Sequence, residues 1–109
     1  MMENLPVAII GGGPVGLAAV AHLLERGETP ILFEAGETVG ASVLKWGHVR
    51  MFSPWEYTVD SATERLLESH GWQNPPKDAL PTGNDLYNLY LCPFANLPEV
   101  QDVVHTGAK

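Results

Sequence analysis

Three glycines and one acid near the start of the chain have the residue types and the spacing to hold a phosphate-containing ligand. Gly11, Gly13 and Gly16 follow the G-x-G-x-x-G pattern. In this pattern the first glycine allows a tight turn, the second lets the backbone approach a pyrophosphate, and the third lets a helix pack close to a strand. Glu34 follows at the position where an acid bonds ribose hydroxyls. Together these residues predict a clamp for a dinucleotide.

The segments on either side of the glycines predict a strand, a helix and a second strand. Val7 to Ile10 is an apolar run without alternation, which is typical of a strand buried on both faces of a parallel sheet. Pro14 suits the first turn of a helix, and Gly27 suits its end. Ile31 to Phe33 then predicts the second strand, which ends at Glu34. An apolar stripe with helical spacing lies between the two ends of the helix, at Leu17, Val20, Ala21 and Leu24.

The first turn of this helix is expected to supply main-chain donors. Its N–H groups have no partner within the helix, and the helix dipole behind them favours a negatively charged pyrophosphate. A βαβ unit that holds no ligand is the alternative, because a glycine-rich turn by itself is a weak signal. A signal peptide or membrane span over residues 5–24 is disfavoured, since Gly11 to Pro14 interrupts the apolar run and no basic residue precedes it.

Length and composition limit the remaining possibilities. The chain has 109 residues, of which 45% are hydrophobic, so it forms at most one small domain with a modest core. Thirteen acids against six bases give a net charge of −7, which argues against nucleic acid or an anionic membrane as a partner. The single cysteine, Cys92, excludes an internal disulfide. We expect a cytoplasmic protein without a metal site.

The chain after Glu34 changes character. Ala35 to Ser42 is expected to be a loop, whose glycines allow close approach to a ligand or serve an ordinary connection. Trp46 to Tyr57 has no helical period and contains Ser53-Pro54, so an extended or irregular segment is expected. Its aromatic side chains either lie across a large planar ligand or pack the segment onto the sheet.

Two more helices are predicted further along. Residues 61–64 fit a capping box that begins one helix, and Gly71 is expected to stop it. Thr82 or Asn84 caps the other helix, which Pro93 is expected to kink or end. Cys92 lies in this second helix and is expected to be a small buried or half-buried residue rather than a nucleophile.

A last β-prone run, Val103 to Thr106, completes three expected strands. A doubly wound nucleotide-binding domain needs more strands than three. The predicted fold class is therefore α/β, a Rossmann-like βαβ unit with extra helices and an incomplete parallel sheet. We expect residues 1–109 to be the N-terminal portion of a single dinucleotide-binding domain, and a fragment of a longer chain.

The stretch VAIIGGGPVGLAAVAHLLERGETPILFEAGETVGASV resembles the N-terminus of FAD-dependent oxidoreductases of the glutathione-reductase-like superfamily. Its glycines and Glu34 stand where the FAD fingerprint of that superfamily places them. The later segments GHVRMFSPWEYTVD and LPTGNDLYNLYLCPFANLP are similar to a bacterial subgroup of flavoprotein monooxygenase-like, NAD(P)-binding proteins.

The resemblance implies roles for particular residues. The three glycines would face the FAD pyrophosphate, with main-chain N–H groups near Pro14 and Val15 bonding it. Glu34 would hold the adenosine ribose, and His48 and Arg50 would reach phosphates or the flavin ring. The candidate cofactor-binding residues are Gly11, Gly13, Pro14, Val15, Gly16, Glu34, Ala35, Ser42 and Arg50. No residue is assigned as a catalytic acid, base or nucleophile.

The resemblance also implies an activity for the full-length protein. It would be an oxidoreductase that takes hydride from NAD(P)H onto FAD and passes electrons to oxygen or an organic acceptor, with a small molecule as substrate. Residues 1–109 would supply the ADP half of the FAD site and would be inactive alone. One alternative is an NAD(P)-dependent dehydrogenase domain. Another is a non-catalytic nucleotide-binding fragment that self-associates through its exposed sheet or pairs with a missing C-terminal part.

Overall fold

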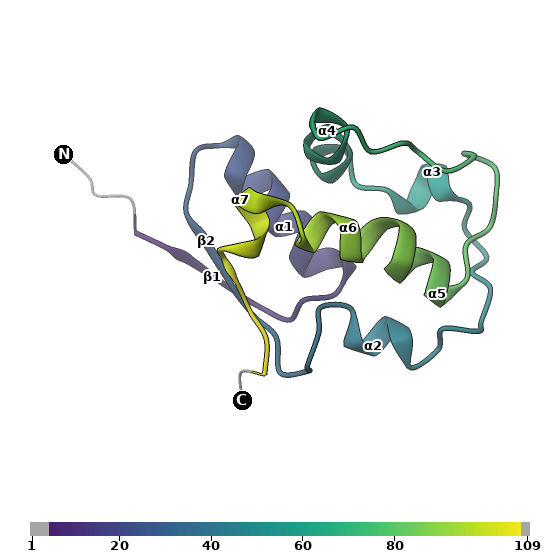
Figure 1. The fold of residues 1–109 in the computed structure, drawn as a ribbon, viewed down its shortest axis with the longest axis horizontal. Helices are drawn as coiled ribbons and strands as arrows, with labels where there is room; N and C mark the ends of the chain where they lie inside the picture. Colours follow the sequence, from purple (N-terminus) through teal and green to yellow (C-terminus); the bar gives the residue numbers. More distant parts are fainter. Residues whose placement is uncertain (1–4, 108–109) are drawn as a thin grey trace.

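Three parallel strands form one sheet in the order β1-β2-β3 in the computed structural model, which describes residues 5–107 (Figure 1). The strands are β1 (Val7–Ile10), β2 (Pro30–Phe33) and β3 (Val104–His105). In the sheet register, Val7 lies opposite Pro30, and Leu32 lies opposite Val104. The prediction of an α/β fold with an incomplete parallel sheet is confirmed.

Helical segments make up most of the remaining structure. They are α1 (Pro14–Glu25), α2 (Ala41–Leu44), α3 (Trp55–Thr58), α4 (Ser61–Ser69), α5 (Gly83–Leu86), the π-helix η1 (Tyr87–Leu91), α6 (Cys92–Ala95) and α7 (Pro98–Gln101). Figure 1 shows the sheet at one end of the molecule, with the helices from α2 to α6 reaching away from it. Within residues 5–107, no helix has both the length and the apolar character needed to cross a membrane.

Helix α1 begins and ends where the sequence predicts. Pro14 occupies its first turn, and the buried side chains of the predicted stripe face the core. At its C-terminus the Glu28 N–H donates to the carbonyl of Leu23 (2.9 Å), and the Gly27 N–H donates to that of Leu24 (3.1 Å). This pair of bonds is a Schellman motif, which satisfies two carbonyls at the end of the helix.

Strand β1 differs from the prediction of a strand buried on both faces. Its bounds are correct, but the Ile10 side chain is 82% exposed, Val7 is also exposed, and only Ile9 is partly buried. The reason is that one face of the sheet is not covered by a helix in the described part of the chain. Ile10 lies opposite Phe33 in the register, and both side chains are exposed.

The aromatic segment is more regular than predicted. The sequence predicts no helix in Trp46 to Tyr57, but the last residues of this segment lie in α3. The loop predicted before it, Ala35 to Ser42, is also shorter, because α2 begins at Ala41. Trp55 is 3% exposed and meets Tyr90 edge-on, with 6.4 Å between the ring centroids. Part of the segment therefore packs into the core.

Helix α4 confirms a predicted element with a corrected N-cap. The sequence predicts a capping box at residues 61–64, but the N-cap is Asp60. The Asp60 carboxylate accepts the Thr63 N–H at 2.9 Å. Both Asp60 and Ser61 are favoured cap types, and Asp60 is also held by His22 and by the Tyr90 hydroxyl. Helix α4 ends just before Gly71, close to the predicted stop.

The third predicted helix is capped by Thr82 and continues past Pro93. The Thr82 hydroxyl and the Asp85 carboxylate form a reciprocal capping box. Pro93 does not end the helix: the π-helix η1 precedes it, and α6 continues to Ala95. A proline breaks the regular bonding pattern of an α-helix, and the wider π-turn accommodates that break.

Candidate functional site

The turn between β1 and α1 brings the three motif glycines together. Gly11 has a φ of +98°, a conformation that favours glycine and turns the chain sharply after the strand. A Cβ on Gly16 would lie 1.9 Å from the carbonyl oxygen of Gly11, so α1 packs directly on the turn only because Gly16 has no side chain. Gly13 is the N-cap of α1, and its carbonyl accepts the Leu17 N–H at 2.9 Å.

An open groove of about 420 Å³ lies along this turn. Gly13 borders it, and a Cβ placed on Gly13 would meet no atom within 4 Å. The N–H groups of Val15 and Gly16, in the first turn of α1, have no acceptor within the helix, and no side chain caps this turn. The groove is lined by Ile9, Ile10, Gly11, Gly13, Pro14, Val15, Gly16 and Ala19.

The attraction of this groove for an anion comes from the main chain, and the negative charge of Glu34 beside the turn opposes it. From Leu5 to Ala21 the sequence contains no charged side chain. Unpaired N–H groups and the positive end of the helix dipole at Val15 and Gly16 are therefore the features that attract an anion there. An anion in this groove would be bound by main-chain N–H groups and the helix dipole rather than by a lysine or arginine side chain.

Glu34 lies beside the turn, at the end of β2. One carboxylate oxygen, Oε1, accepts the Gly12 N–H at 2.7 Å, and the other, Oε2, accepts the Gly36 N–H at 2.7 Å. The structure therefore brings the acid of the motif to the glycine turn, as the spacing predicts. Both oxygens keep further acceptor capacity, because an ionised carboxylate offers about four acceptor positions.

The loop after β2 is attached to the same turn. The Gly40 N–H donates to the carbonyl of Gly12 at 2.8 Å, immediately before α2 begins. Ser42 is exposed on α2, and Ala35 is exposed directly after Glu34. These two predicted site residues therefore belong to segments that adjoin the turn, and their contacts with a cofactor stay predictions.

Arg50 is directed elsewhere. Its guanidinium Nη1 donates to the carbonyl of Leu80, and its backbone forms an isolated antiparallel bridge with Thr82. His48 is exposed on the same segment. The described structure places Arg50 against the loop before α5, so its predicted role at a phosphate or flavin also stays a prediction.

Gly12 is a residue of the site that the motif did not single out. It occupies a variable position of G-x-G-x-x-G, yet it is buried and bonded to both Glu34 and Gly40. The signal available in the sequence was the run of three glycines at 11–13. A glycine at position 12, between the motif glycines 11 and 13, indicates that another group approaches the backbone closely there.

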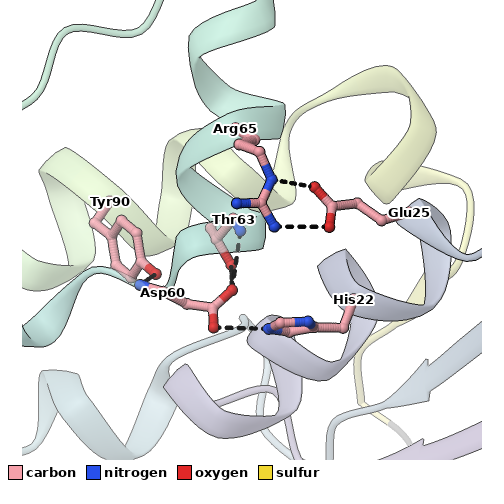
Figure 2. A network of polar contacts seen from close by, with 6 residues as sticks. All are labelled: His22, Glu25, Asp60, Thr63, Arg65 and Tyr90. Carbon is pink, nitrogen blue, oxygen red and sulfur yellow. Dashed lines mark hydrogen bonds and ion pairs between the residues drawn. The ribbon is translucent and has the colours of Figure 1, made fainter.

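A polar network joins α1 to the start of α4 (Figure 2). The His22 Nε2 and Asp60 Oδ1 atoms are 2.9 Å apart. The Arg65 guanidinium donates two bonds to the Glu25 carboxylate, at 2.6 and 2.9 Å. The Asp60 N–H donates to the Tyr90 hydroxyl at 2.8 Å. These contacts fix the far end of the helix whose first turn lines the groove.

The pKa of Asp60 reflects this network. Partial burial would raise it, but hydrogen bonds from the Thr63 N–H, His22 and the Thr63 hydroxyl together lower it below its ordinary value. The side chain is thus held as a carboxylate. Burial also raises the pKa of the Tyr90 hydroxyl, which keeps that group protonated.

Comparison with known proteins gives a family and a set of relatives. Residues 9–71 match the family described as NAD(P)-binding Rossmann-like domain. A protein named monooxygenase cfoE, from Aspergillus candidus, is 35% identical over 104 aligned residues that include 87% of this chain and 17% of cfoE.

Solved structures show the same fold. An oxidized steroid monooxygenase bound to NADP has a TM-score of 0.69 at 22% identity, over 94% of this chain and 20% of that protein. OTEMO in complex with FAD and NADP has a TM-score of 0.69 at 17% identity, over 100% of this chain and 20% of that protein. Bacillithiol disulfide reductase Bdr (YpdA) from Staphylococcus aureus has a TM-score of 0.69 at 22% identity, over 97% of this chain and 29% of the reductase.

The chain thus spans less than a third of the length of each of these proteins. The findings fit the FAD-dependent oxidoreductase superfamily that the sequence resembles. The family match extends from the middle of β1, through the glycine turn and Glu34, to the end of α4. The chain belongs to the family of NAD(P)-binding Rossmann-like domains.

Proposed function

We propose that this chain binds the ADP half of FAD as one portion of a FAD/NAD(P)-binding domain in a longer flavin-dependent oxidoreductase. The observation that carries the proposal is the glycine turn, where uncapped main-chain donors of α1 face an open groove and Glu34 lies alongside. Monooxygenases and a disulfide reductase among the similar proteins support an oxidoreductase over other classes.

The residues fit a dinucleotide in charge and in shape. The N–H groups of Val15 and Gly16 would hold the pyrophosphate, and the space beside Gly13 lets phosphate oxygens approach the backbone. The remaining acceptor positions of the Glu34 carboxylate would take the two ribose hydroxyls. Ala35, in the loop after Glu34, would lie near the adenosine.

A bound flavin would supply the chemistry of such an enzyme, namely hydride transfer from NAD(P)H and electron transfer to oxygen or an organic acceptor. This chain's part is to bind and orient the nucleotide end of the cofactor, and it is expected to be inactive alone. The small-molecule substrate would be held by other parts of the longer protein. For the location of the protein we propose the cytoplasm.

Titration of the purified chain with FAD, ADP and NADH tests the proposal. We expect FAD and ADP to bind, and Gly13→Val to abolish that binding while circular dichroism shows an intact fold, because the added side chain fills open space in the groove. Unchanged binding by Gly13→Val contradicts the pyrophosphate assignment. Tight binding of NADH without any binding of FAD favours the rival NAD(P)-dependent dehydrogenase.

A second candidate, a nucleotide-binding unit that self-associates, is favoured by the open edge of β1. On the side of β2, the N–H groups of Val7 and Gly11 donate to the carbonyls of Thr29 and Phe33. Because main-chain groups alternate in direction along a strand, those of Ala8 and Ile10 point to the opposite, open edge. Among the described residues, the segment from Leu5 to Gly11 that contains β1 carries no charged side chain to protect this edge.

A second copy of the chain would pair there in the antiparallel direction, with a two-fold axis beside Ile9 that sets Ala8 opposite Ile10 of the other copy. Sedimentation of the wild-type chain is expected to show a concentration-dependent dimer, and Ile10→Lys is expected to be monomeric because a lysine blunts an exposed edge. A wild-type chain that stays monomeric at high concentration rules out this mode of association.

A further inference from the structure

The Glu34 carboxylate is the centre of a network that ties three segments of the chain together. Glu34 accepts the N–H groups of Gly12 and Gly36. Each of these glycines also bonds through its carbonyl: Gly12 accepts the Gly40 N–H, and Gly36 accepts the Gly107 N–H, both at 2.8 Å. The glycine turn, the loop after β2 and the residues after β3 therefore meet around one side chain.

The two bonds to Glu34 are short and charge-assisted. Both N···O distances are 2.7 Å, at the short end of the range for an amide and a carboxylate. Gly12 is also packed tightly against this side chain, since a Cβ on Gly12 would lie 3.2 Å from Glu34 Oε1 and 3.3 Å from Leu32. A side chain at position 12 would therefore press on the Glu34 carboxylate, so this contact favours glycine.

We propose that Glu34 is a positioning residue that holds the glycine turn in its ligand-binding shape before any nucleotide arrives. This role is separate from bonding the ribose. The part of the test that measures pyrophosphate binding rests on the proposed function. It also assigns the Gly12 N–H to the carboxylate, so the phosphate is left to the donors of α1.

Inorganic pyrophosphate is the probe that separates the two roles, because it has no ribose. If Glu34 only bonds ribose, Glu34→Gln leaves pyrophosphate binding unchanged or improves it, since the variant removes a negative charge beside an anion site. If Glu34 positions the turn, the variant binds pyrophosphate more weakly, because an amide side chain offers one acceptor oxygen for two N–H groups. Weaker binding by the variant is therefore expected only if Glu34 positions the turn.

Glu37→Gln is the matched control. Glu37 is exposed in the same loop, so its variant makes the same change in net charge. Glu34→Asp is the second variant: it keeps the charge but is too short to reach both amides, and it serves where Glu34→Gln does not fold. We expect both Glu34 variants to bind pyrophosphate about tenfold more weakly than wild type, which is the scale of one hydrogen bond to a charged group.

Amide hydrogen exchange on the ligand-free chain gives a readout that needs no nucleotide. We expect exchange at Gly12 and Gly36 to be faster by about tenfold in the Glu34 variants than in Glu37→Gln. Unchanged exchange at both glycines overturns the inference, as does pyrophosphate binding by Glu34→Gln at or above the wild-type level. Failure of the wild-type chain to bind either ADP or pyrophosphate counts against the proposed function instead, and the exchange result then decides this inference alone.

Discussion

His22 on α1 and Asp60 at the start of α4 are joined through Nε2 and Oδ1 at 2.9 Å, although they are 38 residues apart in sequence. The second oxygen of the same carboxylate accepts the Thr63 N–H and the Thr63 hydroxyl, at 2.9 and 3.1 Å. One acid therefore caps a helix and also ties that helix to the one that carries the glycine turn (Figure 2).

Two substitutions at Asp60 are expected to separate these tasks. Asp60→Ala removes the cap and is expected to lower the free energy of unfolding by about 1 kcal/mol, the usual cost of losing an N-cap. Asp60→Asn keeps a good cap and removes only the charge that faces His22, so its cost is expected to be smaller. Urea denaturation measures both variants, and equal losses would show that the cap contributes little.

The stability of the protein is expected to fall in acid. The pKa of Asp60 lies below its ordinary value of 3.8, and hydrogen bonding lowers the pKa of Glu99 below 4.5. Between the lowered pKa of the folded chain and the ordinary pKa, the unfolded chain binds more protons than the folded chain. Both acids therefore stabilise the fold at a pH above their ordinary pKa, and this stability is lost as the pH falls through their pKa in the folded chain.

Urea midpoints measured from pH 5 to pH 3 test this expectation. Wild type is expected to become steadily less stable over that interval, and Asp60→Asn is expected to show a shallower decline because one of the titrating groups is gone. A midpoint that does not change with pH contradicts the prediction.

Gly16→Ala and Gly13→Ala form a matched pair in the same turn. The methyl group on residue 16 would lie 1.9 Å from a backbone oxygen of Gly11, whereas on residue 13 it would meet no atom within 4 Å. We expect Gly16→Ala to cost about 1–3 kcal/mol, as overpacking does, and Gly13→Ala to cost less. Thermal denaturation measures the difference, and equal melting temperatures would mean that α1 does not rest on the turn.

Phe94 and Phe52 give a matched pair for the core. Phe94 is 0% exposed in α6, and Phe52 is 101% exposed in the segment before α3. Phe94→Ala is expected to lower the free energy of unfolding by about 3–5 kcal/mol, and Phe52→Ala to change it by about 0.5 kcal/mol or less. Denaturant titration of the two variants is the measurement, and similar losses would place Phe52 in a packed environment.

Features set by neighbouring residues were predictable from the sequence. Pro14 and Gly27 mark the ends of α1 because both act on the local backbone, and the apolar stripe between them gives the buried face. The strand bounds at Val7 and Ile10 were likewise correct. The pattern could not give the burial of β1, since burial depends on whether helices cover both faces of the sheet.

Features set by distant contacts were harder to predict. The Gly12–Glu34 bond joins residues 22 positions apart, and the motif treats Gly12 as a spacer. Asp60 and Ser61 are both good cap types, and the contacts of Asp60 with His22 and Tyr90, 38 and 30 residues away, are not visible in the local pattern. The π-turn before Pro93 has no sequence signature comparable to a capping box.

The groove at the glycine turn is built from main-chain donors, and this has a consequence for how such a chain diverges. A point mutation replaces a side chain but leaves the peptide N–H groups of Val15 and Gly16 in place, unless it introduces a proline. Most of the surrounding sequence is therefore free to drift as long as the few steric requirements at the turn are kept. Proteins that share 17–22% of their residues with this chain while keeping its fold are in line with that freedom.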